Sequence, residues 1–209
     1  MPVTDAPGSR PYADDLALML EASRQASAIA MSHFRQDPEV WYKNDGRSPV
    51  SEADIAIDDL LKKMLLDARP GYGWLSEEAE DTEHRLAYSR VFIVDPIDGT
   101  RAYVAGRPDW CVSVGLVEDG KPVAGVLAAP ARGEIWQACA GGGAFLNDVR
   151  LAAGEPEQQN EPLRVAVPDM VAREMHPGID AGLNKVAGGP SLALRVAAVA
   201  RGEGPQDPS

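Results

Sequence analysis

Two stretches of the chain repeat apolar residues at the three- and four-residue spacing of one helix face. The first runs from residue 12 to residue 34, and its apolar positions are Leu16, Met19, Ala22, Ala26 and Ile29. The second begins at Ser51-Glu52-Ala53-Asp54, where an acid three residues after a serine is typical of an N-terminal capping box. Its apolar positions are Ile57, Leu60, Leu61, Met64 and Leu65, and it ends before Pro70-Gly71. We expect two amphipathic helices, joined through the polar, glycine-containing stretch at 43 to 49.

Shorter runs rich in apolar and β-branched residues predict strands after these helices. Strands are expected at residues 73 to 75, 91 to 94, 111 to 118, 122 to 129, 134 to 138 and 163 to 167. Asp119-Gly120-Lys121 is typical of a β-hairpin turn, and Gly141-Gly142-Gly143 of a loop. Residues 191 to 201 predict a further helix. This order of elements predicts an α+β fold in which helices and mixed sheets form layers.

A polar segment at residues 152 to 162 predicts a connector between two parts of the chain. Residues 1 to 151 would form an N-terminal α+β subdomain that carries the functional site. Residues 163 to 209 would form part of a C-terminal α/β subdomain. A chain of 209 residues is long enough for one large domain or two small ones.

The composition changes the list of candidate partners. With 44% hydrophobic and 25% charged residues the chain is an ordinary globular protein. Its net charge of −12 argues against a nucleic acid polymer or an anionic membrane as a partner, because both require a basic face. No apolar run approaches the ~20 residues of a membrane span, and the polar N-terminus lacks the pattern of a signal peptide. Two cysteines without C-x-x-C spacing, Cys111 and Cys139, complete the prediction of a cytoplasmic protein with reduced thiols.

Three carboxylates stand at the ends of predicted strands. Asp95 and Asp98 directly follow the apolar run at 91 to 94, and Glu77 follows the short strand before it. The eighteen positions from Glu77 to Asp95 allow a loop and a return strand, so both strand ends can meet at one edge of a sheet. Buried carboxylates need a partner, and clusters with oxygen ligands alone select hard cations, Mg²⁺ above all.

The residues around Asp98 predict a phosphate site beside the cation. Pro96 fixes the backbone between the aspartates and can turn the carbonyl of Ile97 toward the cation. Gly99-Thr100 would begin a short helix whose N–H groups bind an anion, and glycine lets a phosphate approach closely. The alternative is a turn between strand and helix, in which Asp98 is only an N-cap. The order of strand, D-P-I-D-G-T and helix, with Glu77-Glu78 upstream, favours the functional interpretation.

These segments resemble those of a known family. Trp74-Leu75-Ser76-Glu77-Glu78 and Val94-Asp95-Pro96-Ile97-Asp98-Gly99-Thr100 are similar to motifs of the inositol monophosphatase superfamily of Mg²⁺-dependent, lithium-sensitive phosphatases. That superfamily includes 3′(2′),5′-bisphosphate nucleotidases and histidinol phosphatases. Further matches are Lys43, residues 48 to 54, the hairpin at 110 to 130 and residues 141 to 147, so that the resemblance covers residues 13 to 202.

The resemblance implies two or more Mg²⁺ ions as cofactors. Glu77, Asp95 and the carbonyl of Ile97 would bind the first ion, and Asp95 and Asp98 would share the second. Asp54 matches a position that helps to hold a more loosely bound ion.

The resemblance also implies how a phosphate ester would be bound and hydrolysed. Thr100, aided by Glu77 and Asp54, would orient the water that attacks phosphorus. The amides of Gly99 and Thr100 would hold the phosphate, and Lys43 would lie near the metal site.

The activity implied is that of a phosphomonoesterase acting on a small phosphorylated metabolite. Three substrates stay open: an inositol or related sugar monophosphate, 3′-phosphoadenosine 5′-phosphate, and histidinol phosphate. The basic residue in Thr100-Arg101 leans toward the last two. A homodimer is a further expectation.

One departure from the family concerns the last residues. A later segment of the family carries a W-D pair followed by alanines, and its aspartate completes the second metal site. Residues 191 to 203 match the segment before it, but Gly204 to Ser209 contain no such pair. We therefore expect a truncated or altered C-terminus, a weakened second metal site, and weak activity or none. The alternative function is a catalytically impaired binding or regulatory descendant.

Overall fold

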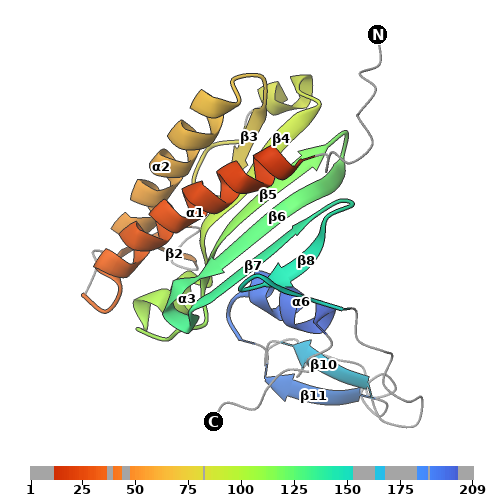
Figure 1. Cartoon of the computed structure of the whole chain (residues 1–209). Coiled ribbons are helices and arrows are strands. Elements are labelled where there is room, and N and C mark those ends of the chain that lie inside the picture. The colour runs from red at the N-terminus through yellow and green to blue at the C-terminus, as the bar shows by residue number, and fades with distance from the viewer. Residues whose placement is uncertain are drawn as a thin grey trace.

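The computed structural model of the chain describes residues 12–36, 40–43, 48–81, 83–152, 163–167, 183–187 and 189–201. A seven-stranded sheet forms its centre, in the order β3-β4-β5-β6-β7-β8-β9 (Figure 1). The strands are β3 (Gly73–Ser76), β4 (Arg90–Asp98), β5 (Cys111–Glu118), β6 (Lys121–Ala129), β7 (Glu134–Cys139), β8 (Gly143–Leu146) and β9 (Val149–Arg150). β3 and β4 run parallel, and the other neighbouring pairs of this sheet are antiparallel. Helices packed on a mixed sheet confirm the predicted α+β class.

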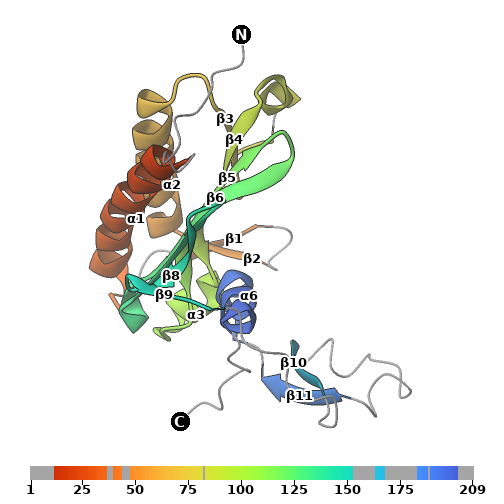
Figure 2. The same ribbon diagram turned by 45° about the vertical axis from the view of Figure 1, so that its right-hand side comes forward.

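Two long helices cover one face of this sheet. α1 (Ala13–His33) and α2 (Glu52–Ala68) lie side by side on it, as Figures 1 and 2 show. The apolar stripes predicted for both helices are buried, including Met19, Ala22, Ile57, Leu61 and Leu65. They pack against buried sheet residues, among them Phe92, Val94, Val112, Val114 and Leu116. The capping box predicted at the start of α2 is present, and the Asp54 carboxylate accepts a 2.8 Å hydrogen bond from the Ser51 N–H.

β4 extends further than its apolar run predicted. The prediction ends this strand at residue 94, but β4 continues through Asp98. Its pairing with β5 shifts between Asp95 and Asp98, which lie three residues apart while their partners on β5 lie two apart. This β-bulge accommodates Pro96, which has no N–H to donate to a neighbouring strand. The predicted strand end was therefore wrong, and both aspartates belong to the last part of the strand.

Several strands form where the sequence is polar or rich in glycine, and these were missed. β1 (Val40–Lys43) and β2 (Ser48–Ser51) make an antiparallel hairpin at the two ends of the polar stretch at 43 to 49, where no strand was predicted. β8 begins at the last glycine of the expected glycine loop, and β9 pairs with it. β10 (Leu163–Val167), which was predicted, pairs in parallel with β11 (Leu183–Ala187), which was not. Strand propensity is strongly dependent on context, so short strands of this kind depend on their partners.

A helix on the opposite side of the sheet from α1 and α2 confirms the prediction for residues 191 to 201. α6 (Leu192–Ala200) lies there with the β1–β2 hairpin in Figure 2. Leu194 is buried in a small cluster with Cys111, Ala129 and Trp136. Other apolar side chains of α6 are exposed, namely Leu192, Val196 and Val199.

Most of the predicted connector, from residue 153 to residue 162, lies outside the described residues, and so does the segment after Arg201. β10 and β11 form a sheet of their own. The division into residues 1 to 151 and 163 to 209 stays a prediction. Within the described ranges, no helix combines the length and the apolar character needed to cross a membrane.

Candidate functional site

The parallel pairing of β3 and β4 brings Glu77 to Asp95. Ser76 is in register with Val94, and the Glu77 N–H donates a 3.2 Å hydrogen bond to the Val94 carbonyl. Asp95 is the next residue of β4. Burial, the negative charges of Glu77 and Asp98, and a hydrogen bond with Glu77 raise the pKa of Asp95 to about 9. The two strand ends therefore meet at one sheet edge, as the spacing predicted.

Asp98, at the end of β4, binds the first turn of α6. Its Oδ2 accepts hydrogen bonds from the Ser191 hydroxyl (2.5 Å) and the Ala193 N–H (2.8 Å). Its Oδ1 accepts a longer one, 3.3 Å, from the Leu192 N–H. A carboxylate is stabilised at a helix N-terminus, where unpaired N–H groups and the helix dipole are positive. Asp98 was the N-cap of the following helix in the alternative interpretation, and that part is wrong, because the N-cap of this helix is Gly99 and no side chain caps it.

Gly99 occupies a position where a side chain would not fit. Its φ is +96°, and a Cβ would lie 2.8 Å from the carbonyl oxygen of Asp109. Gly99 is the N-cap of α3 (Thr100–Val104), so the predicted short helix is confirmed. The Thr100 hydroxyl donates a 2.9 Å hydrogen bond to the carbonyl of Ile97. The first N–H groups of a helix have no partner inside it, so the amides of Gly99 and Thr100 are suited to an anion.

Asp54, in the first turn of α2, lies close enough to Asp95 for its charge to act on that carboxyl group. Only 2% of its surface is exposed, and its Oδ2 accepts hydrogen bonds from the N–H (2.8 Å) and hydroxyl (2.5 Å) of Ser51. Burial, and to a smaller extent the charge of Glu78, raise the pKa of Asp54 to about 6. Its own charge contributes to the raised pKa of Asp95.

Comparison with known proteins identifies the family to which these motifs belong. The sequence profile of the "Inositol monophosphatase family" matches residues 14–204. The chain belongs to the inositol monophosphatase family. An inositol-1-monophosphatase of Mesorhizobium japonicum is 40% identical over 143 residues, which are 65% of this chain and 51% of that protein. A histidinol-phosphatase of Chlorobaculum parvum is 37% identical over 134 residues, 64% of this chain and 51% of that protein.

Solved structures agree with the family. The extragenic suppressor protein SuhB of Bartonella henselae superposes with a TM-score of 0.78 at 28% identity, covering 90% of this chain and 75% of that one. The chain spans about half the length of the curated relatives that it matches.

The structure brings some of the predicted site residues together and leaves others apart. Glu77 and Asp95 meet, with Asp54 near them, and Asp98 lies close enough to raise the pKa of Asp95. In the part of the chain that the structure describes, no three carboxylate, imidazole or thiolate side chains surround one point as in a preformed metal centre. Both oxygens of Asp98 accept hydrogen bonds from the start of α6, and Oδ2 of Asp54 accepts from Ser51, so these carboxylates are directed away from a common point. Lys43 lies in β1, and its side chain is outside the described residues.

The residues nevertheless fit a hard divalent cation. Glu77 and Asp95 form a hydrogen-bonded pair of carboxyl groups, and burial together with the charges of Glu77 and Asp98 raises the pKa of Asp95 to about 9. A divalent cation would replace the proton of Asp95 and relieve the repulsion between the acids. The donors are all oxygen atoms, the ligand type that Mg²⁺ prefers.

Ser191 is the site residue that sequence reasoning missed. Its hydroxyl donates to Asp98, accepts a 3.1 Å hydrogen bond from the Leu194 N–H as the N-cap of α6, and lies 3.7 Å from the Cys111 sulfur. A serine before an apolar helix is a recognisable N-cap signal. Nothing in the sequence pairs it with Asp98.

Proposed function

We propose that the chain carries the metal- and phosphate-binding part of a phosphomonoesterase that acts on a small phosphorylated metabolite. The observation that supports this most directly is the meeting of Glu77 with Asp95, whose pKa burial and neighbouring acids raise to about 9, close to the Gly99 turn. Relatives named as inositol-1-monophosphatase and histidinol-phosphatase support the same reaction class.

Mg²⁺ would be held by Glu77, Asp95 and the carbonyl of Ile97. Asp98 would contribute through Oδ1, which makes the longer contact with α6, while Oδ2 keeps its bonds to that helix. A carbonyl oxygen has two lone pairs, so Ile97 can accept from Thr100 and bind a cation together. When bound, the metal would lower the pKa of a water molecule and neutralise charge on the phosphate.

The side chains around the metal would orient the attacking water. The Thr100 hydroxyl already donates to Ile97, so its lone pairs point elsewhere and can accept a hydrogen bond from water. The raised pKa of Asp54, about 6, suits a group that exchanges a proton near neutral pH. The amides of Gly99 and Thr100 would hold the phosphate oxygens.

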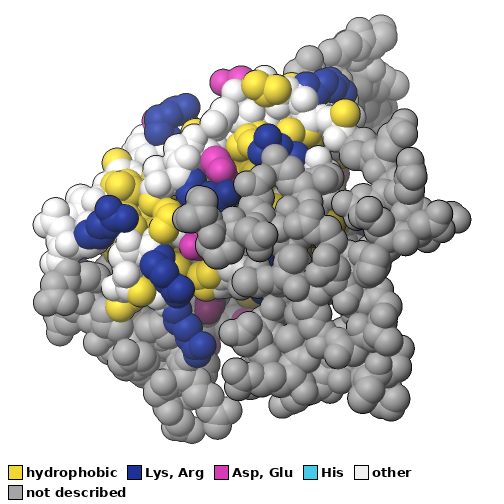
Figure 3. Space-filling view, turned by 90° about the horizontal axis from the view of Figure 1, so that it is seen from below, with side chains coloured by type: hydrophobic (Ala, Val, Ile, Leu, Met, Phe, Trp, Pro, Cys, Tyr) yellow, Lys and Arg dark blue, Asp and Glu magenta, His cyan; other side chains and the backbone are white. Residues whose placement is uncertain are grey.

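An anionic substrate has to approach a chain of net charge −12. Figure 3, which views the molecule from below, shows Lys and Arg side chains beside acidic and apolar ones on that face. Because relatives include inositol-1-monophosphatases and histidinol-phosphatases, inositol monophosphate and histidinol phosphate are the first substrates to test.

Two measurements on the same preparation test the proposal. Isothermal titration with Mg²⁺ is carried out on the wild type and on Asp95→Asn, and phosphate release from both candidate esters and 3′-phosphoadenosine 5′-phosphate is measured with and without Mg²⁺. We expect Mg²⁺ binding that the variant loses, and phosphate release that requires the metal. Equal Mg²⁺ affinity in the two proteins would remove Asp95 from the metal site and with it the proposal.

A further inference from the structure

A second aspartate of α2 is buried next to the loop that carries Glu77. Asp58 is one helical turn after Asp54, and only 7% of its surface is exposed. Its Oδ1 accepts a hydrogen bond from the hydroxyl of Ser76, which is itself 5% exposed and ends β3. A buried carboxylate is costly unless such bonds compensate it. The contact is therefore a specific one and not a chance surface interaction.

The Ser76 hydroxyl also holds the first turn of that loop. Its oxygen accepts a 3.2 Å hydrogen bond from the Glu78 N–H. One serine thus joins the buried Asp58 to the backbone on the far side of Glu77. The other bond at this place is the one from the Glu77 N–H to Val94. Together these bonds determine where the Glu77 carboxylate leaves the sheet edge.

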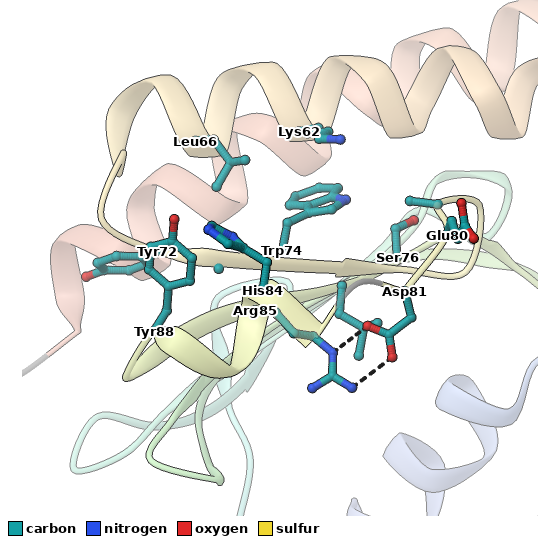
Figure 4. Close-up of a pocket in the computed structure, with 13 residues that line it drawn as sticks. Lys62, Leu66, Tyr72, Trp74, Ser76, Glu80, Asp81, His84, Arg85 and Tyr88 are labelled. Carbon is teal, nitrogen blue, oxygen red and sulfur yellow. Dashed lines mark hydrogen bonds and ion pairs between the residues drawn. The ribbon is translucent and has the colours of Figure 1, made fainter.

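Packing does not hold the loop on the side toward α2. A cavity of about 210 Å³ lies there, lined by the loop residues Ala79, Glu80 and Asp81 and by Lys62 and Leu66 of α2. Figure 4 shows the loop turning back beside this cavity, so that Ser76, Glu80 and Asp81 lie near one another and Asp81 pairs with Arg85. A loop that borders empty space lacks the close contacts that fix buried side chains. The position of the loop therefore depends more on its hydrogen bonds than on packing.

The anchor at the other end of the loop is weaker. Asp81 accepts two hydrogen bonds from Arg85, at 2.7 and 2.8 Å, but the carboxylate is half exposed to solvent. Ion pairs at the surface contribute little to stability. The buried Asp58–Ser76 contact is the firmer of the two.

We propose that Asp58 is a positioning residue for the metal site: through the Ser76 hydroxyl it fixes the loop that presents Glu77 to Asp95. This inference rests on the proposed role of Glu77 as a metal ligand. Asp58 acts through another side chain, so its loss should change the position of the ligand and not the ligand itself. Partners that orient a ligand from behind typically change metal affinity by roughly 10- to 100-fold.

The test compares two buried aspartates that touch opposite ends of the β3 segment. Asp58→Ala removes the contact with Ser76, and Asp15→Ala is the matched control. Asp15 is 4% exposed and accepts a 3.1 Å hydrogen bond from Tyr72, the residue before β3, and a 2.6 Å one from Arg69. Thermal melting without metal and the Mg²⁺ dissociation constant by calorimetry are measured for both. We expect both variants to melt earlier, but only Asp58→Ala to weaken Mg²⁺ binding, by roughly tenfold or more.

A double-mutant cycle tests the route through the serine. Ser76→Ala should weaken Mg²⁺ binding like Asp58→Ala, and the double variant should be no worse than either, because both remove the same link. If Asp58→Ala does not fold, Ser76→Ala takes its place against Asp15→Ala, since it breaks the same link and removes no charge near the site. Two results would overturn the positioning role but not the proposed function. In the first, the wild type binds Mg²⁺ and Ser76→Ala binds it with the same affinity. In the second, Asp15→Ala weakens Mg²⁺ binding as much as Asp58→Ala does. A wild type that binds no Mg²⁺ overturns the proposed function instead.

Discussion

The hydroxyl of Ser191 donates a 2.5 Å hydrogen bond to the carboxylate of Asp98, from which 93 positions separate it along the chain. The same hydroxyl accepts from the Leu194 N–H at the start of α6. A single side chain thus connects the last helix to the strand that ends in the D-P-I-D-G-T motif. The position of the Asp98 carboxylate and the docking of α6 are therefore coupled through this contact.

Replacing Ser191 by alanine should therefore destabilise the chain. The variant loses a helix N-cap and a hydrogen bond to a charged acceptor, which together cost about 2 kcal/mol. Equilibrium unfolding in urea measures the change. Ser32→Ala is the control, because that exposed hydroxyl bonds only to the carbonyl of Ile29 in its own helix, and its loss should stay within about 0.5 kcal/mol. Equal changes in both variants would mean that the contact with Asp98 does not contribute to stability.

Asp95 should make stability depend on pH in an unusual direction for an acid. Its pKa rises from the ordinary 3.8 to about 9 in the folded chain, chiefly through burial and the charge of Glu77. Between these values the folded state holds a proton that the unfolded state releases, so stability falls as pH rises from about 4 to about 9. Asp95→Asn removes this dependence. In EDTA the variant should melt higher than the wild type at pH 8, and the difference should shrink at pH 5.

The same two proteins, melted with added Mg²⁺, test whether Asp95 is a metal ligand. A ligand that binds only the folded state raises its melting temperature. We expect Mg²⁺ at pH 8 to raise the melting temperature of the wild type and to leave that of Asp95→Asn unchanged. A melting difference that is the same at pH 5 and pH 8 would show that Asp95 is ionised in the folded chain without cost.

The sequence predicted those parts of the structure that depend on local pattern. The apolar stripes of α1 and α2 have the helical period, and both stripes are buried as expected. The Asp119-Gly120 turn has φ values of +49° and +78°, which suit a tight hairpin and are typical of these residue types. The meeting of Glu77 with Asp95 also followed from local signals, since both residues lie where predicted strands end.

The rest depends on contacts between distant segments. Asp98 was expected to face a cation, yet its partner Ser191 comes from a helix that no local pattern places beside it. Nothing in the sequence around Asp58 distinguishes it from an exposed helix acid, and only the position of β3 shows that it is buried against Ser76. The bulge that carries β4 past Pro96 likewise requires the pairing with β5. Tertiary pairing overrides local propensity at such places.

Thr100 should affect turnover more than substrate binding, provided that the chain hydrolyses one of the tested esters. Its hydroxyl is proposed to orient the attacking water, and a misplaced nucleophile costs on the order of 10²-fold in rate. Thr100→Ala should lower kcat by that factor with a smaller change in KM, whereas Thr100→Ser keeps the hydroxyl and most of the rate. Steady-state kinetics with saturating Mg²⁺ separates the two parameters. An alanine variant with unchanged kcat would exclude Thr100 from the reaction.

Gly99 and Gly120 form a matched pair that isolates the effect of close packing at the Gly99–Thr100 turn. Both have a positive φ, +96° and +78°, so alanine at either position has the same kind of backbone strain, about 1–2 kcal/mol. At Gly120 a Cβ would meet nothing within 4 Å, whereas at Gly99 it would lie 2.8 Å from the Asp109 carbonyl and 3.3 Å from the Ser191 Cβ. A backbone oxygen cannot rotate away as a side chain can. Gly99→Ala should therefore reduce the free energy of unfolding by roughly 1–3 kcal/mol more than Gly120→Ala does, as overpacked sites do.

Urea unfolding of the two glycine variants measures this difference, and Mg²⁺ titration of both adds a functional comparison. Since Gly99 lies between Asp98 and Thr100, displacement of the turn should weaken Mg²⁺ binding in Gly99→Ala and leave Gly120→Ala like the wild type. Equal losses of stability in the two variants would show that α3 can shift away from Asp109 without cost. The site would then not need glycine at position 99 for packing, and the proposed close approach of a phosphate to its amide would be the only remaining reason for it.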